Sequence, residues 1–346
     1  MSSVSVVIPC YNYGHFLKDA VDSALTGHDG VDVHVLIIDD ASTDDSAQVA
    51  KQIAAENERV DLIVHPVNKG NLATYNEGLL DWASGDYTVL LSADDRLVPG
   101  AITRGSALLD ANPTVGFVYG RPLHFQEGSP LPVPRTEGHG WSVWSGNWWI
   151  ERRFKAGVNC ITSPEVMVRT SLQHKVGGYD PRLGHSGDLE MWLRLAAHAD
   201  VGYLRDIDQT YYRVHSTNMT KSRPPVVDLQ QRRLAFEVML ETCADRVPNA
   251  ALLSEIVHRR LSWEALWIAA RAYDRGHTEE VPVDELAAFA LDCWPQANRM
   301  QVYRGLELRR RIGPRYMPYL QPLILSAVVH KARNWWWWRT WERTGV

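Results

Sequence analysis

The first 95 residues alternate between apolar segments with strand character and segments with helical spacing. Strands are predicted at residues 3–9, 33–38, 60–65 and 87–95. Helices are predicted at residues 16–26, 46–56 and 72–83, where apolar side chains recur with a helical period or follow Ser/Thr/Asp-rich capping residues. Short connections between alternating strands and helices are typical of a doubly wound, mainly parallel sheet, so this stretch predicts an α/β fold.

Polar residues follow the carboxyl ends of three of these predicted strands. They are Pro9 to Asn12, Asp39-Asp40 and Asp94-Asp95. In an open α/β sheet the ligand crevice lies at the carboxyl ends of the strands, so these three loops are expected to face one ligand. Carboxylates at the edge of a core are costly unless a cation or hydrogen bonds hold them.

The loop after the first predicted strand, PCYNYGHF, is not a glycine-rich phosphate loop. It lacks the G-x-G-x-x-G pattern of dinucleotide-binding folds, and no P-loop pattern occurs elsewhere in the chain. Carboxylates that hold a divalent cation are the alternative means of neutralising a diphosphate. Asp94 and Asp95 are suitably placed for that role, with Mg²⁺ or Mn²⁺ as the expected cofactor.

The remaining two thirds of the chain divide at about residue 220. Before it, a long irregular stretch at residues 121–150 is rich in Trp, Pro and Gly, and is followed by strand patterns at 158–168, 201–204 and 209–214 and a helix at 188–198. After it, only amphipathic helices are predicted, at residues 226–246, 251–275 and 283–291. Two domains are therefore expected, at residues 1–220 and 221–346.

The tryptophans of the irregular stretch have two interpretations. Aromatic faces stack on the C–H surfaces of sugars, which favours an acceptor site, but the same side chains could belong to the core. They are Trp141, Trp144, Trp148 and Trp149.

Composition indicates a cytoplasmic protein. The four cysteines are widely separated and form no C-x-x-C pair, so neither a disulfide framework nor a zinc site is predicted. The N-terminal residues do not resemble a signal peptide, and no apolar window approaches the roughly 18 residues of a membrane span.

The charge of −5 is unevenly distributed. Residues 301–346 contain nine Lys/Arg and two Glu, a charge of +7, so the rest of the chain carries −12. Four consecutive tryptophans at residues 335–338 lie within this basic tail, and Trp with Arg suits a bilayer interface. A peripheral contact with the inner membrane face is one interpretation, and a solvated helix end, a disordered tail or an oligomer contact is the other. Nucleic acid is not among the expected partners.

Five segments, taken in order, resemble the inverting family 2 glycosyltransferases of the GT-A fold. They are VSVVIPCYN at residues 4–12, IIDDASTDDS at 37–46, residues 68–95 from NKGNLATYNEGL to GDYTVLLSADD, GGYDPRLGHSGDLEMWLRLA at 177–196, and YYRVHSTNMT at 211–220. The resemblance implies the GT-A nucleotide-diphospho-sugar transferase fold for residues 1–220 and does not extend to the last third.

On the donor side, the resemblance implies a set of nucleotide-binding residues. Pro9 and Tyr11 match positions that flank the base, Tyr11 by stacking. Asp39 and Asp40 match the acidic pair that recognises the base, with Asp40 expected to be the partner of a pyrimidine N–H. Asn68 and Lys69 match the loop that closes over the nucleotide, and Asp94 matches the ribose contact.

The resemblance also implies a metal site and a base. Asp95 matches the metal ligand, and His215 falls where some members place a further metal or diphosphate contact, although a structural histidine is the competing interpretation. Asp188 matches the general base, with Glu190 as the alternative. Trp192, one turn after Asp188, is a candidate for the wall of the site. Ser92 and Gly187 stand where many members have acidic residues.

These matches predict an enzyme that moves a sugar from a nucleoside-diphosphate sugar to a hydroxyl acceptor with inversion. The donor is expected to be a UDP-sugar, and the acceptor a glycan or lipid-linked intermediate of surface polysaccharide biosynthesis. Two alternatives remain, a sugar-1-phosphate nucleotidylyltransferase and a catalytically inactive nucleotide-sugar-binding protein. The sugar, the linkage, the oligomeric state and the role of the C-terminal helices are not indicated by the sequence.

Overall fold

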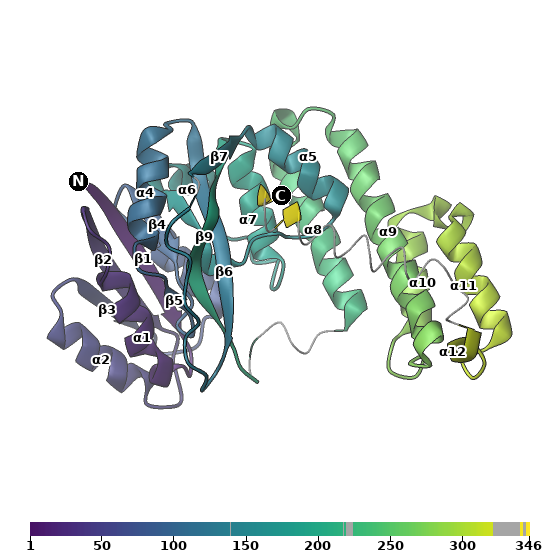
Figure 1. The fold of residues 1–346 in the computed structure, drawn as a ribbon, viewed down its shortest axis with the longest axis horizontal. Coiled ribbons are helices and arrows are strands. Elements are labelled where there is room, and N and C mark those ends of the chain that lie inside the picture. The colour runs from purple at the N-terminus through teal and green to yellow at the C-terminus, as the bar shows by residue number, and fades with distance from the viewer. Residues whose placement is uncertain (139, 217, 219–223, 321–339, 342–343) are drawn as a thin grey trace. The chain divides into compact units, whose positions relative to one another are not determined.

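The computed structural model describes residues 1–138, 140–216, 218, 224–320, 340–341 and 344–346. They form two compact units (Figure 1). The first comprises residues 1–149, 160–218 and 344–345, and the second comprises residues 150–159, 224–320, 340–341 and 346. The change near residue 218 lies close to the predicted boundary at 220. However, residues 150–159 belong to the second, helical unit. No change of composition in the sequence indicates that this segment leaves the first unit.

Four parallel strands form one half of the sheet in the first unit. They are β1 (Ser2–Cys10), β2 (Val31–Asp39), β3 (Val60–Val64) and β4 (Tyr87–Leu90), in the order β3-β2-β1-β4. The apolar side chains of β1 and β2 are almost entirely buried, as expected of strands covered on both faces. The register pairs Cys10 with Asp39 and Asp39 with Val64, so the carboxyl ends of β1, β2 and β3 lie level.

The helices between these strands follow the prediction with one difference. They are α1 (Gly14–Leu25), α2 (Ser46–Glu56) and α3 (Asn71–Asn76). The helix predicted at 72–83 changes from α3 to a π-helical segment over Glu77–Trp82. At Gly78 a Cβ atom would lie 2.3 Å from Cγ1 of Val7, so only glycine allows this segment to pack so closely on β1.

The second half of the sheet is mixed, whereas a mainly parallel sheet was predicted. From β4 the order continues β8 (Met167–Arg169), β6 (Val115–Gln126), β9 (Asp200–Val214) and β5 (Arg96–Leu97), and β7 (Trp141–Trp144) also pairs with β9. The short strand β8 runs antiparallel to both of its neighbours, and β5 and β7 are antiparallel to β9. The half that follows β4 therefore departs from doubly wound topology.

Several element boundaries in this half also differ from the prediction. The two strands predicted at 201–204 and 209–214 form the single strand β9, with a positive φ of 60° at Asp206. The strand predicted at 158–168 is replaced by a 3₁₀ turn at Ser163–Glu165 followed by β8. The stretch 121–150, predicted to be irregular, contains the end of β6, all of β7 and the start of α5 (Gly146–Ala156).

Three further helices complete the first unit. They are α4 (Ala101–Ala111), α6 (Thr170–Val176) and α7 (Gly187–Ala196). The last of these carries Asp188 in its first turn and buries most of its other side chains.

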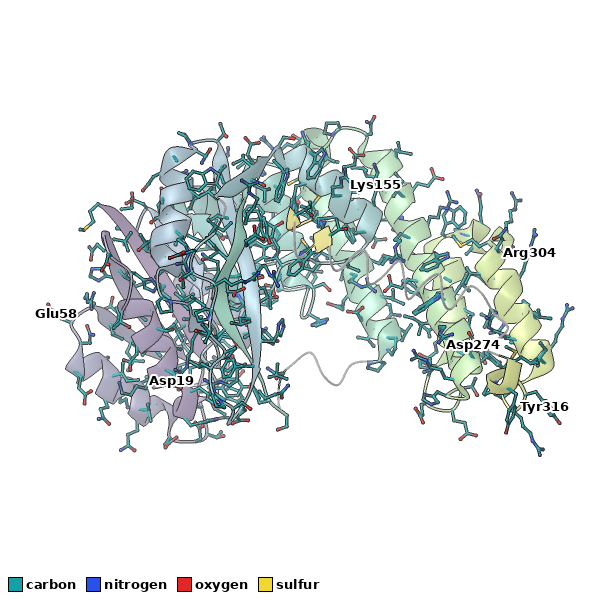
Figure 2. All side chains as sticks on the ribbon, viewed as in Figure 1. Asp19, Glu58, Lys155, Asp274, Arg304 and Tyr316 are labelled. Carbon is teal, nitrogen blue, oxygen red and sulfur yellow. The ribbon has the colours of Figure 1, made fainter. Side chains whose placement is uncertain are left out.

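The second unit is helical, as predicted. Its helices are α8 (Pro225–Cys243), α9 (Ala250–Arg275), α10 (Val283–Cys293), α11 (Gln301–Ile312) and α12 (Met317–Leu320). The buried carboxylate of Asp274 on α9 accepts hydrogen bonds from Arg271 at 3.0 Å and Arg309 at 2.8 Å, which ties α11 to α9 (Figure 2). No helix in the described part of the chain is long and apolar enough to cross a membrane. The four consecutive tryptophans lie outside the described residues.

Candidate functional site

The loops that follow β1 and β2 are bound to each other at the carboxyl end of the sheet. Asn12 and Ala41 have positive φ values of 60° and 59°. The Asn12 side-chain oxygen accepts a hydrogen bond from the Thr43 amide at 2.8 Å. The Gly14 amide donates to Ser46 Oγ at 2.7 Å, and a Cβ on Gly14 would lie 2.7 Å from Cα of Ser46. The two loops are therefore joined along the carboxyl end of the sheet, where a ligand crevice is expected.

Tyr11 and Pro9, the predicted base-flanking residues, differ in accessibility. Tyr11 is 46% exposed at the border of the crevice, so its ring has a free face. Pro9 is part of β1 and pairs with Ile38 in the register of the sheet. Stacking on a base is thus available to Tyr11, whereas Pro9 shapes the strand end beneath it.

Asp39 has a buried carboxylate with one unused oxygen. Its Oδ2 accepts a weak hydrogen bond from the Ser42 amide at 3.2 Å. Its Oδ1 is buried and has no hydrogen-bond partner among the described residues. Because an unpaired buried acceptor is costly, this oxygen is suited to receive an N–H from a ligand.

Asp40, in contrast, is occupied by the protein itself. Its carboxylate accepts hydrogen bonds from the amides of Lys69 at 2.8 Å and Gly70 at 2.9 Å and from His65 Nδ1 at 2.7 Å. Burial would raise the pKa of Asp40, but these donors outweigh it and the pKa is lowered. Asp40 therefore holds the 68–70 loop, whereas Asp39 has an oxygen without a hydrogen-bond partner among the described residues.

Asn68 and Lys69 lie on this loop with exposed side chains. The Asn68 side-chain amide donates to the Asp40 carbonyl at 3.1 Å, and Lys69 Nζ pairs with Glu77 at 2.8 Å. The loop is thus held against Asp40, the residue that follows Asp39.

Asp94 and His215, 121 residues apart, are brought together by the fold. His215 Nε2 lies 2.9 Å from Asp94 Oδ2, and the Asp94 side chain is partly exposed. The His215 ring packs against Tyr13 and Phe16, with centroid distances of 5.5 and 5.6 Å. The imidazole is thus fixed by packing. It faces Asp94, which is more exposed than the adjacent Asp95.

Asp95 points the other way. It is only 2% exposed, and its Oδ1 accepts a hydrogen bond from the Arg213 amide at 2.8 Å. Burial first, and then the neighbouring Asp94, hold the pKa of Asp95 well above the ordinary value. Asp95 therefore anchors the end of β9, whereas Asp94 is the more exposed carboxylate of the two.

The donor set of Asp94 and His215 fits a divalent metal that keeps most of its ligands from elsewhere. No group of three or more His, Cys, Asp or Glu side chains suited to a metal occurs among the described residues. Mg²⁺ and Mn²⁺ commonly bind through one or two protein groups together with substrate phosphates and water. One carboxylate oxygen and one imidazole nitrogen 2.9 Å apart are consistent with such a site.

Asp188 lies in the first turn of α7, where the helix dipole favours a carboxylate. Its side chain is partly exposed and accepts hydrogen bonds from the hydroxyls of Ser163 and Tyr179. Burial raises the pKa of Asp188, and the two hydroxyls oppose that rise. A fixed carboxylate with a raised pKa has the properties of a general base.

Tyr75, which the sequence did not single out, connects the two sides of the site. Its ring meets the Tyr179 ring edge-on at 5.6 Å. Its pKa is raised to about 12, chiefly by burial, then by Asp188 and more weakly by Asp94. Both carboxylates therefore act electrostatically on one phenol. The only available signal was its position on the helix after the 68–70 loop.

Glu190 and Trp192 are parts of the core. Glu190 is 1% exposed and binds Arg194 through both oxygens, at 2.8 and 2.9 Å. Trp192 is buried and stacks on Phe117 with a centroid distance of 5.9 Å. Neither side chain is available to a substrate, so Glu190 as the alternative base and Trp192 as a wall of the site are both excluded by the geometry.

The tryptophans of residues 141–149 lie away from this crevice. Trp149 is buried and donates to the Tyr119 hydroxyl at 3.2 Å, whereas Trp144 stacks on Trp148 and on Tyr203. Strand β7 pairs with residues 201–204 of β9, the end of that strand opposite to His215. The structure therefore favours a packing role for most of this group, and only Trp141, at 39% exposure, presents a free face.

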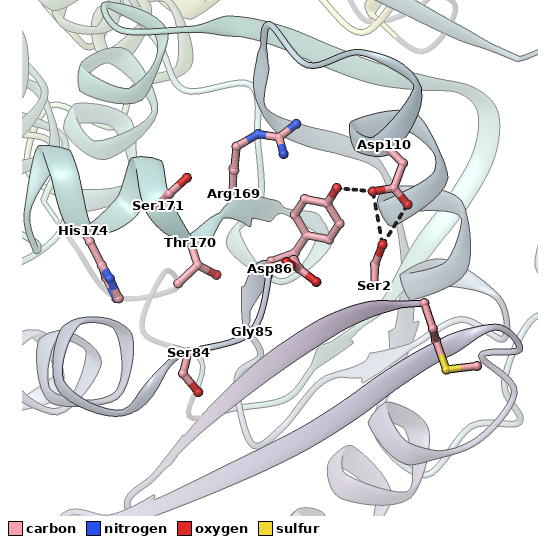
Figure 3. Close-up of a pocket in the computed structure, with 11 residues that line it drawn as sticks. Ser2, Ser84, Gly85, Asp86, Asp110, Arg169, Thr170, Ser171 and His174 are labelled. Carbon is pink, nitrogen blue, oxygen red and sulfur yellow. Dashed lines mark hydrogen bonds between the residues drawn. The ribbon is translucent and has the colours of Figure 1, made fainter.

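A cavity of about 570 Å³ lies at the amino ends of β1 and β4 (Figure 3). Its acidic groups are satisfied within the protein: Asp110 accepts from Ser2 and Tyr87, and Asp86 accepts from the Ser3 amide. Strand β1 runs from this cavity to the crevice, a separation of roughly 30 Å for its length. The cavity is therefore separate from the candidate active site.

Comparison with known sequences gives a match to one family over the first half of the chain. The profile of glycosyl transferase family 2 matches residues 5–170. Chondroitin synthase of Pasteurella multocida is 26% identical over 209 residues, which cover 60% of this chain and 20% of that protein. A Campylobacter jejuni GalNAc(5)-diNAcBac-PP-undecaprenol beta-1,3-glucosyltransferase is 30% identical over 130 residues, 37% of this chain and 41% of that protein. The chain thus matches about a fifth of the length of the synthase.

Solved structures share the fold at low sequence identity. TarS of S. aureus, residues 1–349 in complex with UDP, superposes with a TM-score of 0.58 at 16% identity, covering 92% of this chain and 90% of that one. The mannosyltransferase PcManGT of Pyrobaculum calidifontis, in complex with GDP-Man and Mn²⁺, gives 0.55 at 15% identity, covering 94% and 86%. The predicted GT-A fold and the predicted family resemblance are both confirmed.

Proposed function

Because residues 5–170 form a glycosyl transferase family 2 domain, we propose that this chain transfers a sugar from a nucleoside-diphosphate sugar to a hydroxyl acceptor, with inversion at the anomeric carbon. The observation that carries the proposal is the arrangement around Tyr75. A carboxylate–imidazole pair, Asp94 and His215, and a separately held carboxylate, Asp188, lie around this phenol. The Asp94–His215 pair suits the departing diphosphate, and Asp188 suits the attacking hydroxyl.

On the donor side, Tyr11 stacks on the base and Asp39 Oδ1 accepts an N–H from its edge. This geometry suits the N3–H of uracil, and TarS, which shares the fold, has been crystallised with UDP and with UDP-GlcNAc. The donor of first choice is therefore a UDP-sugar. Guanine also offers an N–H to a carboxylate, so a GDP-sugar is the comparison to make.

The diphosphate is held near Asp94 and His215, which would bind Mg²⁺ or Mn²⁺ when it is present. The metal supplies positive charge that neutralises the departing diphosphate. The chain's own contribution is to fix the two ligands: Tyr13 and Phe16 pack on the His215 ring, and the Asn218 side chain accepts the His215 amide at 2.6 Å. The roles of Asp94 in metal binding and of Asp95 as an anchor replace those predicted from the resemblance.

On the acceptor side, Asp188 takes the proton from the attacking hydroxyl. The oxygen attacks the anomeric carbon on the face opposite the diphosphate, the bond from that carbon to the diphosphate oxygen breaks, and the configuration inverts. The hydroxyls of Ser163 and Tyr179 orient the carboxylate for this step. A base of this kind contributes about 10²–10⁴-fold to the rate.

Two alternatives lack a supporting observation. A nucleotidylyltransferase must hold a triphosphate, and the loop after β1 offers no Lys or Arg before Lys18. An inactive nucleotide-sugar-binding protein would need no base, yet Asp188 is held by two hydroxyls and electrostatically coupled to Tyr75.

The acceptor is proposed to be a glycan or lipid-linked intermediate of surface polysaccharide synthesis, assembled at the cytoplasmic face of the membrane. The name of the Campylobacter relative, an undecaprenol-linked glucosyltransferase, and the basic tail support this location. Part of the basic charge is internally paired, since Arg310 binds Asp284 and Glu307. Flotation with anionic liposomes tests the contact: the full chain should float and a chain truncated after residue 326 should not, and equal behaviour of the two would contradict it.

Transfer is tested by incubating the protein with UDP-sugars and GDP-sugars, with and without Mn²⁺, and measuring release of the nucleoside diphosphate. The proposal predicts metal-dependent release from one donor class, stimulated by a hydroxyl acceptor. Absence of release from every donor, by protein that binds UDP and Mn²⁺, would favour the inactive alternative.

A further inference from the structure

The segment 344–345 belongs to the first unit, although it lies far beyond the rest of that unit in the sequence. Gly345 is buried there, and its carbonyl oxygen accepts a hydrogen bond from the Tyr119 hydroxyl. Cys160 Sγ lies 4.0 Å from the same oxygen. The residues that receive this segment form what we call the tail socket, which is made of Tyr119, Trp149, Cys160 and Tyr203.

The tail socket accepts a glycine at position 345 and no larger residue. The φ of Gly345 is +79°, a conformation that residues with a side chain rarely adopt. A Cβ atom there would lie 2.6 Å from Cγ of Tyr203. This ring has no room to move, because it is buried and packs on Tyr119 and Trp144 with centroid distances of 5.2 and 5.9 Å. Backbone conformation and space therefore both select glycine.

The Tyr119 hydroxyl is directed at the segment by the protein around it. Trp149 Nε1 donates to this hydroxyl at 3.2 Å, and an indole N–H can only donate. The single proton of the hydroxyl is therefore available for the carbonyl of Gly345. Both side chains are completely buried, so the direction of the donor is fixed by packing.

One wall of the tail socket continues directly into the residues that hold Asp188. Cys160 and Ser163 lie three positions apart in the sequence. The 3₁₀ turn at Ser163–Glu165 is fixed at its start by a capping box at Thr162. The Ser163 hydroxyl then donates to the Asp188 carboxylate. A change at the tail socket is thus passed to the candidate base through one short, tightly held segment.

We propose that the tail socket is a docking site for the chain's own segment 344–345, and that docking holds residues 160–163 in the position from which Ser163 orients Asp188. The site recognises a peptide backbone at a glycine, with one carbonyl acceptor, a left-handed conformation and no side chain. Gly345 is a positioning residue, since it acts on the base through residues 160–163. Docking itself does not depend on the proposed function, and only its consequence for transfer rests on it.

The first experiment measures docking without a donor or an acceptor. Gly345→Ala should displace the segment, so the rate at which N-ethylmaleimide modifies Cys160, followed by peptide mass spectrometry, should rise by at least about tenfold. The matched control is Gly128→Ala, which has a similar φ of +75° but no described atom within 4 Å of the added Cβ. It should be labelled at the wild-type rate. Equal labelling of Cys160 in Gly345→Ala and the wild type would overturn the proposal.

The remaining cysteines serve as internal controls for unfolding. They are all buried, so selective labelling of Cys160 reports release of the segment rather than loss of the fold; they are Cys10, Cys243 and Cys293. Tyr119→Phe is a second variant, which keeps the ring but removes the donor to Gly345. It should increase the labelling of Cys160 less than Gly345→Ala does.

The second experiment supplies the segment in trans. A peptide of residues 338–346 should bind to the full-length Gly345→Ala protein, whose own segment is displaced, and should restore the protection of Cys160. The same peptide carrying Gly345→Ala should bind at least about tenfold more weakly, as measured by fluorescence anisotropy. Equal affinity of the two peptides, or binding without restored protection, would overturn the proposal.

The third experiment separates positioning of the base from a merely structural role. In Gly345→Ala, kcat should fall by about tenfold, because Asp188 loses a fixed support, while the affinity for UDP with Mn²⁺ should stay at the wild-type value. The wild-type peptide should restore kcat, and the peptide with Gly345→Ala should not. An unchanged kcat in protein with a labelled Cys160 would contradict the link to the base. If the wild type transferred from no donor, the proposed function would fail instead, and the protection of Cys160 would still decide docking.

Discussion

Two adjacent aspartates stand at the end of β2 and two more lie in the turn between β4 and β5, and the two pairs divide their work in the same way. At the end of β2, Asp40 holds the 68–70 loop while Asp39 keeps a buried oxygen without a partner. In the turn between β4 and β5, Asp95 holds the Arg213 amide while Asp94 faces His215. In each pair, one carboxylate anchors a neighbouring segment while the other is left to serve the ligand.

The pairs agree in which member faces the ligand. In the first pair it is the earlier residue, Asp39, and the second anchors; in the second pair the same order holds, with Asp94 ahead of Asp95. The anchored segments differ, however, in their distance along the sequence. Asp40 holds a loop 28 to 30 residues later, and Asp95 holds a strand end 118 residues later. Loss of the Asp95 anchor should therefore disturb long-range structure, and loss of the Asp40 anchor a local cover.

The largest effect is expected at Asp188, which belongs to neither aspartate pair. Its substitution should affect the chemical step without affecting nucleotide binding. Asp188→Asn should reduce transfer by about 10²–10⁴-fold, because the amide cannot accept the proton, and should leave UDP affinity unchanged. Steady-state transfer rates and calorimetric UDP titration measure the two quantities. Retained transfer would mean that the base is elsewhere.

A contrast between Asp94→Asn and Asp95→Asn tests the β4 pair. The first should lose Mn²⁺-dependent activity by at least about 10²-fold, because a metal ligand is removed. The second should stay within a few-fold of wild type, since an amide oxygen still accepts the Arg213 N–H. The activity of both variants is measured as a function of Mn²⁺ concentration. A larger loss in Asp95→Asn than in Asp94→Asn would support the roles first predicted for these residues.

A corresponding contrast tests the β2 pair. Asp39→Asn should weaken UDP binding by about tenfold, because a neutral amide oxygen is a weaker acceptor than a carboxylate, with little change in the free energy of unfolding. Asp40→Ala should instead lower the free energy of unfolding by about 1–3 kcal/mol, because the Lys69 and Gly70 amides lose their acceptor. Calorimetry and urea unfolding separate the two effects. Equal behaviour of the variants would remove the distinction between anchor and ligand-facing residue.

The smallest effect concerns the pH dependence of Asp188. Burial raises its pKa, so activity should be lost on acidification at a higher pH than for an ordinary aspartate. Ser163→Ala removes a hydrogen bond that favours the ionised form, so the acid limb of kcat/KM should move to still higher pH. Ser171→Ala, beside the cavity at the amino ends of the strands, is the control and should leave the limb unchanged. A shift to lower pH in Ser163→Ala would contradict the assigned contact.

Local patterns predicted the first half of the sheet well because each of its strands and helices carries its own period and its own polar ending. The second half was harder. Strand β8 has three residues and lies between β4 and β6, and its antiparallel direction depends on pairings that no local pattern encodes.

The candidate site shows the same limit. The acidic pairs, His215 and Asp188 were found from motif positions, but the direction in which each aspartate points depends on distant partners such as Arg213. The exclusion of Glu190 depends on Arg194, whose own anchors are carbonyls of the 176–178 turn. Tyr75 and His65 were missed because their roles exist only after α3 and the strand ends have been brought together.

The most direct test of the division within the two pairs is one binding experiment with four variants. Asp39→Asn, Asp40→Asn, Asp94→Asn and Asp95→Asn are each titrated with Mn²⁺ and UDP, and bound metal is followed by electron paramagnetic resonance. Asp94→Asn should lose ordered Mn²⁺, Asp39→Asn should retain the metal at higher UDP concentrations, and Asp95→Asn should bind both as the wild type does. Loss of Mn²⁺ in Asp95→Asn with retention in Asp94→Asn would contradict the account.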